Sequence, residues 1–281
     1  MKKPSSLSIW QAGAAALAYG RSTEEQLDAV RKCGNHAVTP VLRTRLLAGL
    51  GVPRPKEQAE HCVVFGCYRP FADPYLVRDY IRVLELLKVD YTYLDQEQCC
   101  GMPFAMMPRS ADRDAALAES VAFNKQNDEQ ATRKGAKKLA YCCMGCAYAA
   151  RNAAPDAQDR HVYLPDLIFD QLGQRQLAVK PMRVGYFEGC HSFARSAYPA
   201  GSFDWSRYRK QLQAVDGLTI IDLQKDRCCK NSADEIVGRA LEMDAATVVC
   251  PCNSCASSIG LAGQGKITMM SLPELLLEIL A

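Results

Sequence analysis

The sequence lacks the long apolar run that a membrane-spanning helix requires. Such a helix needs roughly 18 consecutive apolar residues, whereas the apolar stretch from Ile9 to Leu17 is short and is interrupted by Gln11. The sequence also has no twin-Arg pair and no convincing cleavage site of a signal peptide. We therefore expect a cytoplasmic protein without an integral membrane segment.

A strong excess of charge of either sign is also missing. The 34 Lys and Arg residues nearly balance the 31 Asp and Glu residues, and the formal net charge is +3. So small a charge gives no reason to expect nucleic acid as a partner. No GxGxxG motif follows a predicted strand, so we expect any flavin or nicotinamide cofactor to belong to a partner protein.

Cysteine, by contrast, is abundant, and its spacing is repeated. Ten of the 14 cysteines form the pattern C…CC…CxxC twice. The first set is Cys67, Cys99, Cys100, Cys143 and Cys146, and the second set is Cys190, Cys228, Cys229, Cys252 and Cys255. A chain of 281 residues that is 48% hydrophobic can form a core without disulfides. Adjacent cysteines are also poor disulfide partners, so the pattern favours metal or cluster binding.

Strand-like and helix-like segments alternate around both cysteine sets. Apolar, β-rich runs precede the cysteine groups, and we expect strands near 61–67, 91–94, 138–141, 183–190, 218–223 and 246–249. The segments 164–172 (LPDLIFDQL) and 272–280 (LPELLLEIL) are also alike. We predict an α/β fold with two pseudo-symmetric repeated domains, 61–178 and 179–281, that have mostly parallel sheets. A helical N-terminal extension, 1–60, precedes them.

Parallel strands end on the same side of a sheet, so the cysteine groups of each domain should converge there. Thiolates are soft ligands that suit iron–sulfur clusters or zinc. A structural zinc site made from both CxxC pairs is one alternative, but the two pairs lie more than 100 residues apart. A thioredoxin-like dithiol is another, and it leaves both CC pairs unexplained.

The doubled C…CCG…CxxC pattern resembles the CCG-domain family, and most closely the B-type subunit of heterodisulfide reductase, over about residues 61–281. The resemblance implies two noncubane [4Fe–4S] clusters, each held by the five cysteines of one set. It also implies a disulfide or related sulfur substrate that lies between the clusters and is cleaved or formed in one-electron steps. The partners it implies are an A-type flavoprotein subunit together with a small, ferredoxin-like C-type subunit.

Three features depart from the family pattern. Lys230 replaces the glycine after the second CC pair, and about 60 extra residues precede the first motif cysteine. Only 22 residues separate Cys229 from Cys252, against 42 between Cys100 and Cys143. The second cluster could therefore be smaller or altered. The departures favour the B-type subunits of the heterodisulfide reductase-like complexes of sulfur-oxidising bacteria. That subfamily implies sulfane sulfur carried on a lipoate-binding protein as substrate, and its further partner is a second B-type subunit.

Two residues beside the second set are candidate catalytic groups. His191 follows Cys190 directly, and it could move protons or tune a cluster through a hydrogen bond to sulfur. Lys230 would place a positive charge beside the second cluster and attract an anionic substrate. Each could equally be a solvated surface residue. The roles of the remaining thiols are open, although lone thiols are more often buried apolar residues; these are Cys33, Cys62, Cys142 and Cys250.

The family resemblance also leaves a second function open. CCG domains occur in quinone-linked oxidoreductases of the glycolate oxidase and fumarate or succinate reductase types. In that alternative the chain is a non-catalytic electron-transfer subunit, and the sulfur chemistry takes place elsewhere.

Overall fold

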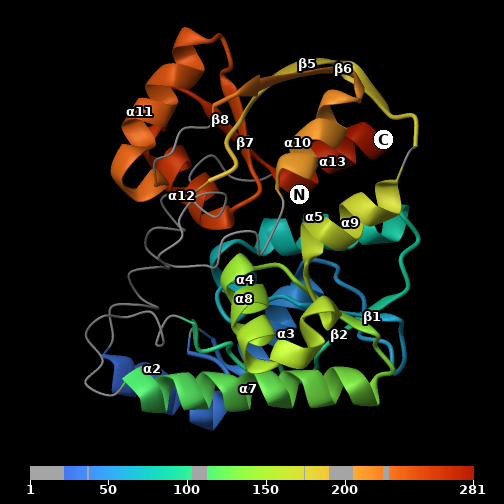
Figure 1. The fold of residues 1–281 in the computed structure, drawn as a ribbon, viewed down its shortest axis with the longest axis vertical. Coiled ribbons are helices and arrows are strands. Elements are labelled where there is room, and N and C mark those ends of the chain that lie inside the picture. Colours follow the sequence, from blue (N-terminus) through green and yellow to red (C-terminus); the bar gives the residue numbers. More distant parts are fainter. Residues whose placement is uncertain (1–21, 37, 103–112, 174, 190–204, 224–227) are drawn as a thin grey trace. The chain divides into compact units, whose positions relative to one another are not determined.

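A computed structural model describes residues 22–36, 38–102, 113–173, 175–189, 205–223 and 228–281. The chain forms two compact units (Figure 1), one with the described residues up to Gln171 and the other at Leu172–Ala281. Each unit contains a four-stranded sheet in which every strand pairing is parallel. The predicted α/β fold with parallel sheets is therefore confirmed.

The first unit has a doubly wound sheet of strand order β2-β1-β3-β4. Its strands are β1 His61–Val64, β2 Tyr91–Tyr93, β3 Lys138–Tyr141 and β4 His161–Tyr163. Its connecting helices are α4 Arg69–Ala72, α5 Pro74–Leu86, α7 Arg113–Arg133, α8 Met144–Ala153, the 3-10 turn η1 Pro155–Arg160, and α9 Leu164–Leu172. The strand order reverses between β1 and β3, and sheets of this kind bind ligands beyond the strand ends at that point.

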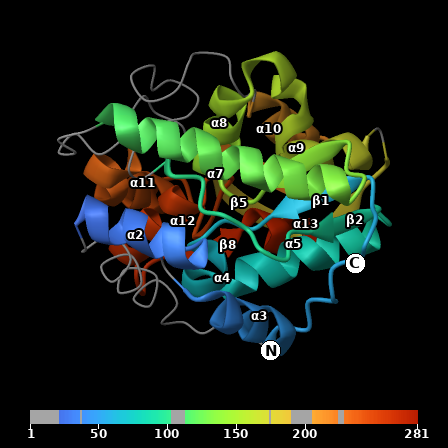
Figure 2. The ribbon, with the colours of Figure 1, turned by 90° about the horizontal axis from the view of Figure 1, so that it is seen from below.

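In the described part of the chain before β1, two helices pack within the same unit. Helix α2, Thr23–Cys33, begins with a capping box between Ser22 and Glu25. Helix α3, Pro40–Gly49, begins after the cap Thr39. Figures 1 and 2 both show α2 beside α7, and an ion pair of 2.5 Å joins Arg31 Nη2 to Glu119 Oε1. Helices α2 and α3 are thus part of the first unit.

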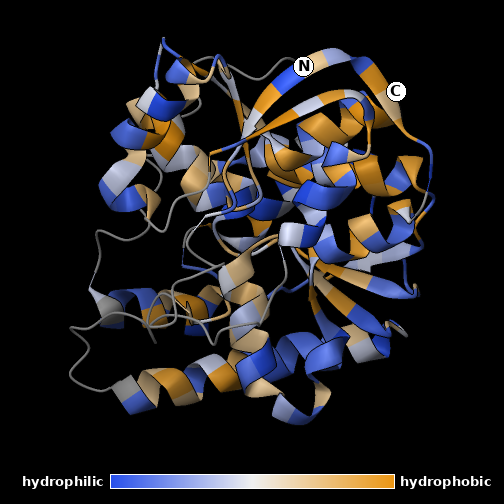
Figure 3. Ribbon diagram, turned by 45° about the horizontal axis from the view of Figure 1, so that its top comes forward, coloured by the Kyte–Doolittle hydropathy of each residue, from blue (hydrophilic) through white to orange (hydrophobic). Residues whose placement is uncertain are grey.

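Helix α7 presents a buried face that is partly polar. The buried residues recur at helical spacing: Ala116, Ser120, Phe123, Asn124, Asn127 and Ala131. In Figure 3 this long helix, at the bottom of the view, is accordingly mixed blue and orange. Because buried polar side chains need hydrogen-bond partners, this face can hold a neighbouring loop as well as pack against it.

The second unit repeats the topology of the first, with strand order β6-β5-β7-β8. Its strands are β5 Ala178–Tyr186, β6 Asp216–Asp222, β7 Thr247–Cys250 and β8 Thr268–Ser271. Its helices are α10 Ser206–Gln213, α11 Cys229–Glu242, α12 Asn253–Ala262 and α13 Leu272–Leu280. The similar segments of the sequence form α9 and α13, and each follows the fourth strand of its sheet. The fourth strands, β4 and β8, were not among the predicted strands.

Each unit has its own core around its sheet. Fully buried aromatic residues fill the first unit at Phe65, Tyr80 and Tyr141, and the second unit at Tyr186 and Tyr208. Within the part of the chain that the structure describes, no helix is both long enough and apolar enough to cross a membrane.

Candidate metal centre

Three loops at the carboxyl ends of β1, β2 and β3 carry the first cysteine set. Cys67 follows β1, the pair Cys99-Cys100 follows β2, and the CxxC pair, Cys143 and Cys146, follows β3. The three strands are adjacent and parallel. The sheet therefore delivers all five cysteines to one edge, at the reversal of strand order.

The five thiols form a continuous chain of contacts. Cys99 Sγ lies 3.4 Å from Cys67 Sγ, and the side chains of Cys99 and Cys100 interact closely enough to shift the pKa of Cys99. Cys100 interacts in the same way with Cys146, and Cys146 with Cys143. Four of these cysteines are buried, and Cys143 is half-buried. The structure thus gathers the whole first set in one largely dry site.

Cys143 is prepared to bind as a thiolate. It is the N-cap residue of α8, so its sulfur lies near the backbone N–H groups of Gly145 and Cys146. The hydrogen bond with the Cys146 thiol is the main cause that lowers the pKa of Cys143 to about 5, and the positive charge of Arg69 and these two N–H groups also contribute. Metal binding requires deprotonated thiols, so this thiol meets the requirement at neutral pH.

A glycine at the end of the first strand of each sheet lets the chain pass close to the CxxC pair. A methyl group on Gly66 would lie 3.5 Å from Cys146 Sγ, and one on Gly189 would lie 2.9 Å from Cys255 Sγ. Both glycines have positive φ angles, +85° and +93° respectively, which L-residues rarely adopt. The two units therefore build this part of the site in the same way.

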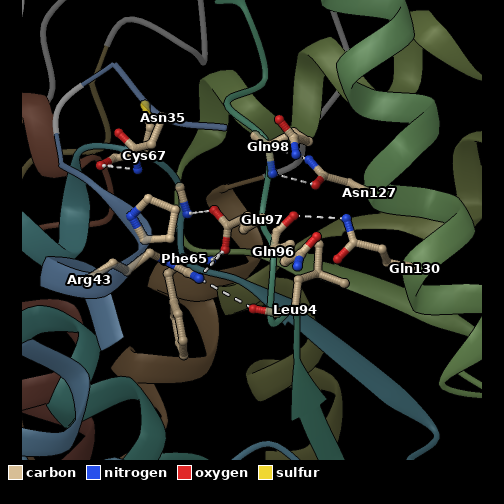
Figure 4. Close-up of polar contacts among 12 residues, drawn as sticks. Asn35, Arg43, Phe65, Cys67, Leu94, Gln96, Glu97, Gln98, Asn127 and Gln130 are labelled. Atoms are coloured by element: carbon tan, nitrogen blue, oxygen red, sulfur yellow. Dashed lines mark hydrogen bonds and ion pairs between the residues drawn. The ribbon is translucent and has the colours of Figure 1, made fainter. Parts of the chain in front are cut away.

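Helix α7 holds the loop that carries Cys99 and Cys100. Its polar face binds backbone groups at alternate positions of the loop: Gln130 to Gln96 O at 2.8 Å, Asn127 to Gln98 N at 2.7 Å and Gln98 O at 2.8 Å, and Asn124 and Ser120 to Cys100 O at 2.9 and 2.6 Å. Figure 4 shows the contacts of Gln130 and Asn127. Because the loop is tied at every second residue, the CC pair has a fixed position.

Glu97 links the same loop to the end of β1 (Figure 4). Its carboxylate forms a buried ion pair of 2.7 Å with Arg43 Nη2 and accepts hydrogen bonds from Phe65 N at 3.0 Å and Gly66 N at 2.5 Å. Burial raises the pKa of Glu97, while Arg43 and the two N–H groups oppose that rise. The network joins the chain just before Cys67 to the chain just before Cys99.

The N-terminal segment contributes a histidine to the first site. Gly34 O accepts a hydrogen bond of 2.7 Å from Cys99 N, and Asn35 Nδ2 donates one of 3.1 Å to Cys67 O. His36 Nε2 lies 3.2 Å from Cys67 Sγ. His36, Cys67 and Cys99 are all buried, and their potential ligand atoms lie within 4.8 Å of one another. No pattern in the sequence singles out His36, since it lies outside the repeat and outside any periodic segment.

Four thiols of the second set also meet. The side chain of Cys229 interacts with those of Cys255 and Cys228, and Cys255 interacts with Cys252, closely enough to shift the pKa values of Cys229 and Cys255. The hydrogen bond with Cys255 is the main cause that lowers the pKa of Cys229 to about 7. The fifth member of the set, Cys190, and the adjacent candidate His191 lie outside the described residues.

The structure gives a physical reason for the CCG motif in one unit and CCK in the other. Gly101 has a φ of +71°, and a methyl group there would lie 2.7 Å from Ser120 Cβ on α7, so only glycine fits. In the second unit Cys229 and Lys230 form the first turn of α11, where no glycine is needed. The Lys230 side chain is exposed, and its role in binding stays a prediction.

The cysteines outside the two sets have buried or peripheral positions. Burial raises the pKa of Cys62 to about 12 and raises those of Cys142 and Cys250 well above the usual range. Such thiols are unreactive and pack as small apolar residues. Cys33 is half-buried and lines a pocket of about 270 Å³ between α2, α3 and the 95–98 loop.

Comparison with known proteins gives the class of the first site. Residues 63–150 match the family model of the CCG cysteine-rich domain, and this range contains all five cysteines of the first set. The chain therefore contains a CCG domain.

The chain is also similar to one particular reductase component. It is 25% identical, over 187 residues, to the D-type subunit of the dihydromethanophenazine:CoB–CoM heterodisulfide reductase of Methanosarcina mazei. The match covers 62% of this chain and 43% of that protein, so it spans less than half the length of the relative. The CCG domain and the relation to heterodisulfide reductase are thereby confirmed, while the assignment to the B-type subunits stays a prediction.

Proposed function

We propose that the chain is the iron–sulfur component of a heterodisulfide reductase-like oxidoreductase and acts on a disulfide or sulfane-sulfur substrate. The observation that carries the proposal is the unbroken series of contacts among five thiols in the first unit. A donor set made only of sulfur suits iron–sulfur clusters. A closed tetrahedral zinc site uses four ligands, so a fifth thiol in contact favours a cluster over zinc.

The residues present fit one cluster in each unit. The first would be held by the five thiols of the first set, and the second by the four described thiols of the second set together with Cys190. Sequence neighbours such as Cys99 and Cys100 cannot easily reach separate corners of one cubane, so this spacing favours a noncubane [4Fe–4S] cluster. When bound, such a cluster supplies one-electron transfer to or from a sulfur substrate.

The protein itself supplies an ordered, water-poor environment for that chemistry. Burial of the first thiols keeps water away, and Arg69 offsets part of the negative charge at Cys143. In the second unit, we assign His191 to proton transfer and Lys230 to attraction of an anionic substrate. Both assignments rest on their sequence positions beside Cys190 and Cys229.

The relative is named as one component of a larger reductase, which supports a role within a complex. We propose that its partners there are a flavoprotein and a ferredoxin-like protein. The departures in the second cysteine set favour a cytoplasmic complex of sulfur oxidation. Its substrate would be bound to the lipoate of a carrier protein, and it would include a second B-type subunit.

The test is the iron, sulfide and zinc content of anaerobically purified protein, followed by electron paramagnetic resonance with and without a persulfide. We expect about eight irons for two four-iron clusters and a signal that changes with the sulfur compound. Cys99→Ser should lose the iron of the first site, whereas Cys62→Ala, a buried cysteine outside the set, should keep it. Unchanged iron in Cys99→Ser would contradict the ligand assignment, and zinc in place of iron would contradict the redox role.

One outcome would favour the second function. A full complement of iron that responds to no sulfur compound, but still exchanges electrons with a quinone-linked acceptor, would identify an electron-transfer subunit. About four irons would indicate that one unit lacks a complete cluster, and the second unit, with its altered motif, would then be tested by Cys229→Ser.

A further inference from the structure

His36 stands in a position where it can act on the first site. It is only 2% exposed, and its Nε2 atom lies 3.2 Å from Cys67 Sγ. A cysteine sulfur bound to iron carries no proton, so in the loaded site Cys67 can only accept a hydrogen bond. The imidazole must then donate its Nε2–H, a role open to histidine in its neutral or charged form.

The chain on both sides of His36 is anchored to the thiol loops. On one side, Gly34 O accepts from Cys99 N at 2.7 Å. On the other, the Asn35 side chain joins Cys67 O at 3.1 Å to Val38 N at 3.1 Å. These bonds tie the segment to the loops after β1 and β2. Leu27 and Val30 of α2 also help to bury the thiols, since they belong to one buried cluster with Cys67 and Cys99.

The donor set favours a hydrogen bond over shared metal ligation. The site already offers five thiols, and a noncubane cluster as proposed would use all of them. His36 Nε2, at 3.2 Å from Cys67 Sγ, is then placed to donate a hydrogen bond to that sulfur.

We propose that His36 donates a hydrogen bond to the Cys67 sulfur and raises the reduction potential of the first cluster. The inference rests on the proposed iron–sulfur function and adds a residue from outside the matched range, 63–150. Hydrogen bonds to cluster sulfurs stabilise the more negative, reduced state. His36 is therefore a positioning and tuning residue contributed by the N-terminal segment.

The test compares four variants of the full chain in a redox titration followed by electron paramagnetic resonance. The signal of the first cluster is identified as the one that Cys99→Ser removes. We expect His36→Leu to keep its iron but to lower the potential of that signal, by about tenfold in the reduction equilibrium or about 59 mV for one electron. His36→Gln, which retains an N–H donor near the ε position, should recover most of the shift.

His61→Leu is the matched control, because His61 is buried in the same unit at the opposite end of β1 from Cys67. It should leave the potential unchanged. An unmoved potential in His36→Leu, or an equal shift in His61→Leu, would overturn the role of His36 while leaving the cluster in place. Loss of iron together with the loss of a nitrogen hyperfine coupling would show that His36 is a metal ligand, which also overturns the proposal. Wild-type protein without iron would overturn both this inference and the proposed function.

Discussion

Replacement of Gly101 by alanine tests how α7 fixes the first CC pair. The added methyl group would lie 2.7 Å from Ser120 Cβ and 2.8 Å from Ser120 Cα, so the loop or the helix must move. The left-handed backbone at +71° adds about 1–2 kcal/mol for an L-residue, and overpacking adds about 1–3 kcal/mol. We therefore expect Gly101→Ala to lower the free energy of unfolding by about 2–5 kcal/mol.

Gly51→Ala is the matched control for this prediction. Gly51 has nearly the same φ, +74°, but no atom lies within 4 Å of the position of an added methyl group. It should lose only the backbone contribution, about 1–2 kcal/mol. Urea unfolding followed by circular dichroism gives both values, and iron analysis shows whether the moved loop still binds. Equal losses in the two variants would refute the claim that contact with α7 dictates the glycine.

Three further predictions concern the network and the thiols. Arg43→Met leaves Glu97 buried without its cation, and it should lower the free energy of unfolding in urea by about 3–5 kcal/mol. The control Lys56→Met breaks the exposed pair with Asp90 and should lower it by under about 1 kcal/mol. Similar losses in the two variants would contradict the importance of burial. In metal-free, reduced protein, mass spectrometry should show that iodoacetamide modifies Cys143 at pH 7. The modification should decrease as the pH falls through about 5, because protonation removes the thiolate of Cys143, whose pKa is lowered to about 5. Cys62, whose pKa is raised to about 12, should stay unmodified. Gly189→Ala, whose methyl group would lie 2.9 Å from Cys255 Sγ, should reduce the iron bound by the second unit, whereas Gly265→Ala, with a similar φ and open space around it, should not.

Much of the fold could be predicted because the relevant signals are local. The predicted strand near 91–94 is β2, and the predicted strand at 138–141 is β3. The capping box at Ser22 and the glycine at 34 mark both ends of α2. The parallel sheet followed from the alternation of strands and helices, and the meeting of the cysteine groups followed from the parallel sheet.

The fourth strands were missed for a physical reason. Strands β4 and β8 contain only three and four residues, and each runs directly into the helix whose leucine pattern dominates the local sequence. Because no turn separates the strand from the helix, no turn residues mark the boundary between them in the sequence. Ser232 and Glu235 also have the spacing of a capping box and so predict a helix start at Ser232. The structure differs, because α11 begins at Cys229 and has a non-helical backbone at Ser232.

The residues that position the first site escaped prediction because their partners are distant in sequence. Glu97 meets Arg43 across 54 positions, and His36 meets Cys67 across 31. The sequence around these residues does not predict either pair. A polar residue in a loop is most often solvated, so only the fold reveals that these side chains are buried together.

The two cysteine sets show why a motif and its site are different things. In the first unit the CC pair is held from outside by α7, and the glycine exists because that helix passes so close to it. In the second unit the CC pair opens α11 itself, with Cys228 as the N-cap residue, and a helix N-terminus favours thiolates. The pair then needs neither a glycine nor a long connection, which accounts for both Lys230 and the shorter spacing to Cys252. The second unit has CCK in place of CCG because its CC pair is positioned by α11 itself and not by a neighbouring helix. Four thiols of the second set still interact with one another. The glycine that Lys230 replaces is therefore not a requirement for the second cluster that we propose.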